Sequence, residues 1–312
     1  MKKKFKNIFL NDDKMAIIAK ANKILADYIG KYDITLRGLY YQFVRRDWFP
    51  ESWQDPATGS TNNVRSYKKL GDIIGDGRLS GLIDWDVLGD EGRFIRELTA
   101  WDSPASIIRA VAEQYRTDMW EGMDYRPEVW IEKNALIGLV EPVTNRHRVA
   151  LFSCVGYASL TAFYEAANRL KRTINNGQKP VILHLGDHDP SGCDMSRNIH
   201  EQLEMFVGRS VIFKRLALNM DQIEEFQPPP NPAKITDSRA KKYIEEHGEE
   251  SWELDALEPQ QFDDVITAAI EEYVDEEQLE ANQEKERTEK AQLQKVSDRW
   301  DNVVGYINKL KD

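Results

Sequence analysis

The chain has 312 residues, of which 41% are hydrophobic and 30% charged, a composition typical of a soluble globular protein with about two domains. It contains no run of eighteen apolar residues, which excludes a membrane span, and its net charge of −11 argues against a protein that coats nucleic acid non-specifically. The two cysteines, Cys154 and Cys193, cannot make a disulfide scaffold and indicate a reducing cytoplasm.

Charge is distributed unevenly along the chain. Residues 1–80 contain 15 Lys and Arg against 9 Asp and Glu, whereas residues 201–312 contain 14 against 27. The first quarter is therefore the candidate nucleic-acid surface. The acidic last third is expected to be solvated or to face a partner.

Three helices and a strand are predicted in residues 1–98. Apolar residues recur with helical spacing over 13–30, Thr35 can cap a second helix that runs to Trp48, and a third helix is expected near 64–75. The alternation over 82–88 suits a strand. This order of elements resembles a winged helix-turn-helix domain, which binds double-stranded DNA.

Strands and helices then alternate. A connecting helix capped by Ser103 is expected within 99–126, strands at 128–131, 149–152 and 181–185, and helices at 135–140 and 160–170. Such alternation predicts an α/β domain over 127–275 with a mostly parallel sheet. Residues 276–312 are rich in Glu, Gln, Lys and Arg, which favours an exposed helical tail.

Carboxylates follow two of the predicted strands. Glu132 comes directly after the strand at 128–131, and Asp187 and Asp189 come after the strand at 181–185, where Gly186 and Gly192 permit a tight turn. Open α/β sheets bind their ligands at the carboxyl ends of the strands. Because hard oxygen ligands suit Mg²⁺ or Mn²⁺, the pattern predicts a site for one of these ions, which can support phosphodiester chemistry.

The same residues also fit a purely structural interpretation. In that case Asp189 belongs to an ordinary Asp-Pro-Ser-Gly turn, and Glu132 pairs with Lys133 at the surface. Asp194 could be a further acidic group of the site or the cap of the following helix.

A family resemblance adds to the metal interpretation. Trp130-Ile131-Glu132-Lys133-Asn134-Ala135, Gly156-Tyr157, and Leu185-Gly186-Asp187-His188-Asp189-Pro190-Ser191-Gly192 resemble the motifs of a TOPRIM domain, in the version found in the topoisomerase VI A subunit and the meiotic double-strand-break transesterase. In that family the Glu and the two Asp bind the metal. The resemblance implies that role for Glu132, Asp187 and Asp189.

The second predicted helix carries a tyrosine between arginines. Arg37, Tyr41 and Arg45 fall at i, i+4 and i+8, so Tyr41 is expected to be flanked by two guanidinium groups that favour the phenolate and hold a DNA phosphate. Tyr41 could instead simply pack on a neighbouring helix. Arg37-Gly38-Leu39-Tyr40-Tyr41 resembles the family's Arg-Asp-Ile-Phe/Tyr-Tyr motif, with Gly38 in place of Asp. This resemblance implies that Tyr41 attacks DNA and that Arg37 assists it.

These expectations lead to a DNA-cleaving enzyme that depends on Mg²⁺ or Mn²⁺ and forms a 5′-phosphotyrosyl link. Arg45, Arg65, Lys68 and Lys69 are candidate DNA contacts. In that family the tyrosine of one protomer works with the metal site of the other, so the resemblance implies a homodimer. Since the chain has no Walker motif, ATP-driven strand passage would need a separate B-type ATPase subunit.

Two alternatives remain open. The first is a TOPRIM nuclease that uses water as its nucleophile, like the Wadjet nuclease subunit, and the second is a non-catalytic DNA-binding module.

Overall fold

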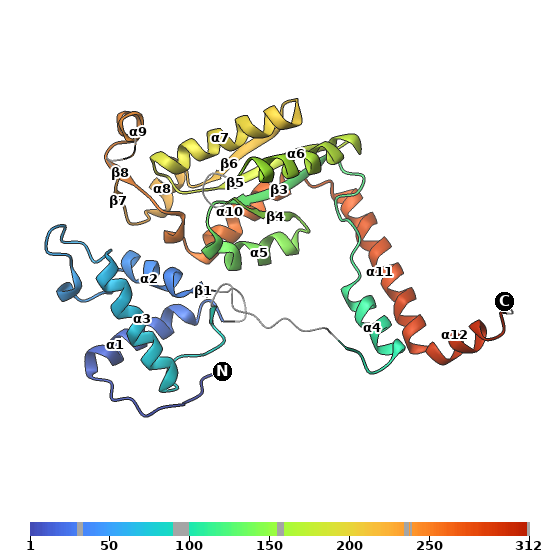
Figure 1. Ribbon diagram of the computed structural model, residues 1–312, viewed down its shortest axis with the longest axis horizontal. Coiled ribbons are helices and arrows are strands. Elements are labelled where there is room, and N and C mark those ends of the chain that lie inside the picture. Colours follow the sequence, from blue (N-terminus) through green and yellow to red (C-terminus); the bar gives the residue numbers. More distant parts are fainter. Residues whose placement is uncertain (30–33, 90–99, 155–158, 234–236, 238, 311–312) are drawn as a thin grey trace. The chain divides into compact units, whose positions relative to one another are not determined.

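The computed structural model describes residues 1–29, 34–89, 100–154, 159–233, 237 and 239–310. It is a mixed α/β structure with a central parallel sheet and a helical C-terminal region (Figure 1). The chain forms two compact units: Met1–Gly92 with Pro127–Glu272, and Arg93–Arg126 with Tyr273–Asp312. None of the described helices is long and apolar enough to cross a membrane.

The central sheet has the strand order β4-β3-β5-β6, and β3 pairs in parallel with β4, as β5 does with β6. Its strands are β3 (Tyr125–Ile131), β4 (Ala150–Ser153), β5 (Lys179–Leu185) and β6 (Ile212–Ala217). The three predicted strands are confirmed, and β6 was not predicted. Because the inner strands are buried on both faces, their apolar residues form nearly continuous runs.

Helices cover both faces of this sheet. In Figure 1, α6 and α7 lie on one face and α5 and α10 on the other. Their bounds are α5 (Ile137–Arg146), α6 (Leu160–Asn175), α7 (Pro190–Val207) and α10 (Pro259–Glu271). Trp130 and Ile182 of the sheet pack with Phe163 of α6 and Ile199 of α7 in a buried core.

Three helices pack together at the N-terminus of the chain. They are α1 (Asp12–Leu25), α2 (Leu36–Arg45) and α3 (Val64–Leu79), and the two short strands β1 (Ile34–Thr35) and β2 (Leu88–Gly89) pair in parallel beside them. The predicted cap is confirmed, because the Thr35 side chain accepts a hydrogen bond from the Gly38 amide at 3.1 Å. The expected end of the first helix at Gly30 lies outside the described residues.

The strand predicted over 82–88 is wrong. Only Leu88 and Gly89 form a ladder, whereas the Asp86 amide donates to the Asp84 side chain at 2.9 Å and so closes a turn. Arg78 also donates hydrogen bonds to the carbonyl oxygens of Trp85 and Leu88. Local side-chain bonds to the backbone therefore replace the ladder that the alternating pattern favoured.

Short elements complete the first unit; one of them follows α2, and the others lie between β3 and the last helices. They are η1 (Glu51–Trp53), η2 (Asn134–Leu136), α8 (Met220–Phe226), β7 (Asn231–Pro232), α9 (Ala240–His247), β8 (Glu250–Ser251) and η3 (Leu254–Ala256). The sequence from β8 to η3 lies against the acidic turn that follows β5, because His188 and Trp252 exchange two backbone hydrogen bonds.

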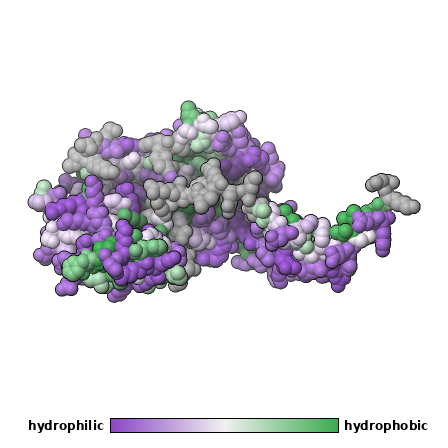
Figure 2. Space-filling view, turned by 60° about the horizontal axis from the view of Figure 1, so that its bottom comes forward, coloured by the Kyte–Doolittle hydropathy of each residue, from purple (hydrophilic) through white to green (hydrophobic). Residues whose placement is uncertain are grey.

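The second unit contains α4 (Pro104–Gln114), α11 (Glu276–Asp298) and α12 (Trp300–Ile307), and Ser103 caps α4 as predicted. Polar groups anchor α11 to the segment around α4: Asn282 donates to the Met119 carbonyl at 3.1 Å, and Ser297 donates to the Ala105 carbonyl at 3.0 Å. Figure 2 shows hydrophobic residues at the surface of the C-terminal helices. They include Tyr306, Ile307 and Leu310.

Candidate metal and nucleophile site

The structure brings Glu132 together with the acidic turn. The Glu132 amide donates to the Leu185 carbonyl at 3.0 Å, so β3 and β5 end at the same edge of the sheet. The Asp187 amide donates to Glu132 Oε2 at 3.3 Å. Glycine at position 186 leaves room for this approach, because a Cβ there would lie 2.9 Å from Glu132 Oε2 and displace that side chain. Two of the three predicted metal-binding residues, Glu132 and Asp187, are thus in contact.

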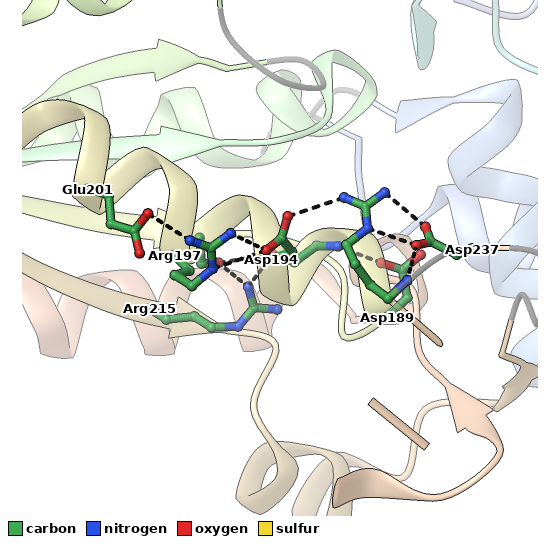
Figure 3. A network of polar contacts seen from close by, with 9 residues as sticks. Asp189, Asp194, Arg197, Glu201, Arg215 and Asp237 are labelled. Carbon is green, nitrogen blue, oxygen red and sulfur yellow. Dashed lines mark hydrogen bonds and ion pairs between the residues drawn. The ribbon is translucent and has the colours of Figure 1, made fainter. Parts of the chain in front are cut away.

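Asp189 caps helix α7. Its Oδ1 accepts a hydrogen bond from the Gly192 amide at 2.6 Å, which fixes the carboxylate at the N-terminus of the helix. Gly192 is required as well, since a Cβ there would lie 2.3 Å from the Asp187 carbonyl oxygen. Asp194 takes no part in this cap and instead forms ion pairs with Arg197 and Arg239 (Figure 3).

The ammonium group of Lys133 lies at the centre of the acidic cluster. Its Nζ is 3.0 Å from Asp187 Oδ2 and 2.9 Å from Glu253 Oε2, with Asp255 Oδ2 at 3.4 Å. Burial alone would lower the pKa of Lys133, but these three carboxylates outweigh it and raise the pKa. The lysine therefore does not pair with Glu132 at the surface. It is a fixed internal cation held by β3 and by the segment that leads into η3.

Sequence reasoning left Glu253 and Asp255 without a role. Asp255 is 4% exposed, and its Oδ1 has no hydrogen-bond partner among the described residues. Burial raises the pKa of Asp255 to about 6, although Lys133 opposes the shift. The available signal was the resemblance of the sequence from Ser251 to Leu257 to an acidic Glu-Leu-Glu-Ala-Leu stretch near the C-terminus of the same family, which by itself pointed to no chemistry.

Negative charge remains uncompensated at Glu132. Burial raises its pKa to about 7, and the neighbouring Asp187 and Asp189 carboxylates add to the shift. Burial likewise raises the pKa of Asp187, even though Lys133 and the Leu254 amide, which donates to Asp187 Oδ1 at 2.7 Å, favour its charged form. A cation bound beside Glu132 would relieve this repulsion.

Tyr41 reaches the same cluster from helix α2. Its side chain is 6% exposed, Arg37 Nη2 lies 3.5 Å from the hydroxyl, and the Glu253 carboxylate is close enough for its charge to act on the phenol. The expected activation of the phenol is wrong for this arrangement. Burial, reinforced by the charge of Glu253, raises the pKa of Tyr41 to about 12 in spite of Arg37.

Arg45 does not flank Tyr41. Its guanidinium donates to the carbonyl oxygens of Ala256 and Phe226 and forms an ion pair with Glu258 at 3.4 Å. These contacts occupy Arg45 in joining α2 to the C-terminal part of the same unit. The spacing in the sequence could not show this, because the partners lie more than 180 residues away.

The other predicted DNA contacts lie on α3. Arg65 and Lys68 are exposed, and among the described residues neither has an ion-pair or hydrogen-bond partner. Lys69 is half-buried, with its ammonium 5.0 Å from the centre of the Trp53 ring. Arg65 and Lys68 are therefore free to meet a phosphate, whereas Lys69 already has an aromatic partner.

Arg215 of β6 binds the backbone of the acidic turn, residues 186–192. Its guanidinium donates to the carbonyl oxygens of Asp187 at 2.6 Å and Gly186 at 3.1 Å, and to that of Gly192 at 3.1 Å. It also contacts Ser196, whose hydroxyl lies 3.1 Å from Nδ1 of the fully buried His184. This residue was not predicted, because the strand that carries it was missed.

The donor set fits a hard divalent cation. Glu132, Asp187 and Asp189 offer carboxylate oxygens at one sheet edge, where burial and the neighbouring carboxylates together raise the pKa of Glu132. Among the described residues no three such side chains yet surround a common point. The physical reason is that Lys133 holds Asp187 and the cap holds Asp189. Binding thus requires the ammonium group to shift.

Compared with protein-family models and with curated proteins, the chain gives no match. The motif pair Gly156-Tyr157 lies outside the described residues.

Proposed function

We propose that this protein cleaves double-stranded DNA in a reaction that depends on Mg²⁺ or Mn²⁺, with Tyr41 as the nucleophile. The observation that carries the proposal is the neighbourhood that Tyr41 shares with the acidic cluster: the charge of Glu253 acts on the Tyr41 phenol, Glu253 pairs with Lys133, and Lys133 pairs with Asp187. Since Tyr41 and the acidic turn are 146 positions apart in the sequence, their proximity comes from the fold alone. The proposal treats residues 1–98 as a winged-helix DNA-binding domain and 127–275 as a TOPRIM-like domain.

Each side chain has a task in this scheme. Arg37, exposed and next to the Tyr41 hydroxyl, holds the phosphate, while Glu253 accepts the phenol proton. The Tyr41 oxygen bonds to phosphorus, the bond from phosphorus to the 3′ oxygen breaks, and that oxygen leaves with a proton from water. When bound by Glu132, Asp187 and Asp189, a divalent cation supplies electrostatic stabilisation of the charge that develops on the phosphate and the leaving oxygen.

A covalent-adduct assay tests the tyrosine. Supercoiled plasmid is incubated with protein and Mg²⁺, denatured, and probed for protein attached to 5′ ends. Wild type is expected to give an adduct, and Tyr41→Phe none. Tyr40→Phe is the matched control, because Tyr40 is buried nearby but donates to Thr61, Asn62 and Asn63. Adduct formation by Tyr41→Phe would exclude the tyrosine mechanism.

A water-dependent nuclease is the second candidate, and one observation favours it. Tyr41 is buried and its pKa is raised to about 12, so the phenol must be uncovered before it can attack. A nuclease using water needs no such movement. It predicts free 5′ phosphates, full activity of Tyr41→Phe and loss of activity in Asp187→Asn.

The proposal includes a homodimer and leaves room for a B-type ATPase partner. Tyr41 meets the acidic cluster of its own chain, so one chain can supply both halves of the site. We therefore expect that mixing Tyr41→Phe with Asp187→Asn protein restores no cleavage. Restored cleavage would show instead that the tyrosine of one protomer serves the metal site of the other.

A further inference from the structure

A cavity of about 620 Å³ opens beside Arg37, and its other lining residues have no role in the proposed reaction. The start of α2, one face of α3, strand β2 and residue Ala135 of η2 form its walls. Its volume falls in the range of cavities that hold small ligands or a unit of a larger one. Arg37 links it to the Tyr41 hydroxyl, 3.5 Å from Arg37 Nη2.

Glycines leave this cavity open. Gly71 and Gly75 lie four residues apart on the same side of α3, and both line it together with Gly89. A Cβ at Gly75 or Gly89 would meet nothing within 4 Å, so packing does not require glycine there. Glycine inside a helix costs about 1 kcal/mol relative to alanine. Packing therefore does not explain why position 75 is glycine. The need to keep space for a bound group does explain it.

The walls of the cavity are positively charged. Two of its lining residues are arginines, and of the described residues that line it none is acidic, in a chain whose net charge is −11. Arg78 is fixed by its bond to the Leu88 carbonyl at 3.1 Å and by stacking on Trp85, yet its Nε is buried without a partner among the described residues. Such a site selects an anion.

An aromatic ring completes the wall. Tyr67 lines the cavity and is held by an edge-on contact with Tyr40, whose ring centre is 5.4 Å away. Aromatic side chains beside a positively charged groove are the usual means of binding single-stranded nucleic acid without sequence preference.

We propose that this cavity binds a sugar-phosphate unit of the DNA strand, next to the phosphate that Tyr41 attacks. The inference rests on the proposed function. Arg37 then contacts two neighbouring phosphates of the strand. Arg78 and the side of α3 that carries Gly71 and Gly75 contact the sugar-phosphate unit next to the phosphate that Tyr41 attacks. A free nucleotide has the same chemistry and is the alternative that the experiment separates.

Binding of a fluorescent DNA duplex, measured by anisotropy, tests the cavity. Gly75→Glu adds a negative side chain whose Cβ meets nothing within 4 Å, and we expect DNA binding about tenfold weaker and a salt dependence reduced by about one phosphate contact. Gly75→Ala should bind like wild type. Gly305→Glu is the matched control, because it adds the same charge at an equally open helical glycine in the other unit.

The outcomes separate the two proposals. If wild type binds DNA and Gly75→Glu binds it as well as Gly305→Glu does, the cavity is not a DNA-binding site, and the proposed function is unaffected. Wild type without any affinity for DNA overturns both. The second arm is a titration with dTMP and with ATP. If Gly75→Glu weakens the binding of either nucleotide but leaves DNA binding unchanged, the cavity binds a free nucleotide, and the proposal that it binds the DNA strand is wrong. Circular dichroism confirms that each variant is folded.

Discussion

Replacing Glu132 by glutamine should stabilise the metal-free protein. The pKa of Glu132 rises from 4.5 to about 7 on folding, chiefly through burial, so the folded state keeps this proton longer than the unfolded state does. The stability of wild type therefore falls as the pH rises from about 4.5 to about 7. At about 1.4 kcal/mol per pKa unit, the cost at pH 8 is at most about 3 kcal/mol. Glutamine has no such titration and keeps the shape of the side chain.

Urea unfolding at pH 5 and pH 8, with and without Mg²⁺, measures the effect. We expect Glu132→Gln to match wild type at pH 5 and to exceed it at pH 8 by up to about 3 kcal/mol. At a Mg²⁺ concentration 100 times the dissociation constant, wild type should gain about 2.7 kcal/mol and the variant almost none. Glu224→Gln, at an exposed position in α8, is the control. Equal stability of Glu132→Gln and wild type at pH 8, or an equal gain from Mg²⁺, would refute the reasoning.

Three further predictions follow from named contacts. Arg215→Met leaves the turn carbonyls without their donor, so urea unfolding should show a loss of about 3 kcal/mol, and calorimetry a weaker affinity for Mg²⁺; an unchanged Mg²⁺ affinity would contradict its positioning role. Burial lowers the pKa of His184 from 6.5 to about 3, so between pH 6.5 and 5 wild type should lose about 2 kcal/mol that His184→Gln does not lose, and parallel stability curves would contradict this. Lys68→Ala should reduce the slope of DNA affinity against salt by about 1, whereas Arg45→Ala should leave it unchanged and lower the free energy of unfolding; the reverse pattern would restore Arg45 as a DNA contact.

The sequence predicted the parts of the fold that depend on local pattern. The buried runs at 128–131 and 181–185 became β3 and β5, and the helical spacing around Thr35 and Ser103 became α2 and α4. It failed at 82–88, where bonds from Asp84 and Arg78 to the backbone override an alternating pattern. The pattern contains no information about such bonds.

The candidate site was predictable only in part. Glu132, Asp187 and Asp189 were found because each follows a strand directly. The place of Lys133 at the centre of the cluster depends on Glu253 and Asp255, which approach from more than 100 residues away. The contact of α11 with the segment around α4 could not be predicted either, because polar side chains such as Asn282 make it and α11 has no apolar face that would indicate it.

Cleavage of supercoiled plasmid by Asp189→Asn tests the central claim most directly. Asparagine caps helices as well as aspartate does, so the α7 cap is retained and only the charge of the proposed metal ligand is lost. We expect wild type to cleave the plasmid with Mg²⁺ and not with EDTA, and folded Asp189→Asn to be at least a hundredfold slower, in line with the usual effect of removing an electrostatic group from a catalytic site. Cleavage by Asp189→Asn at the wild-type rate would contradict the account.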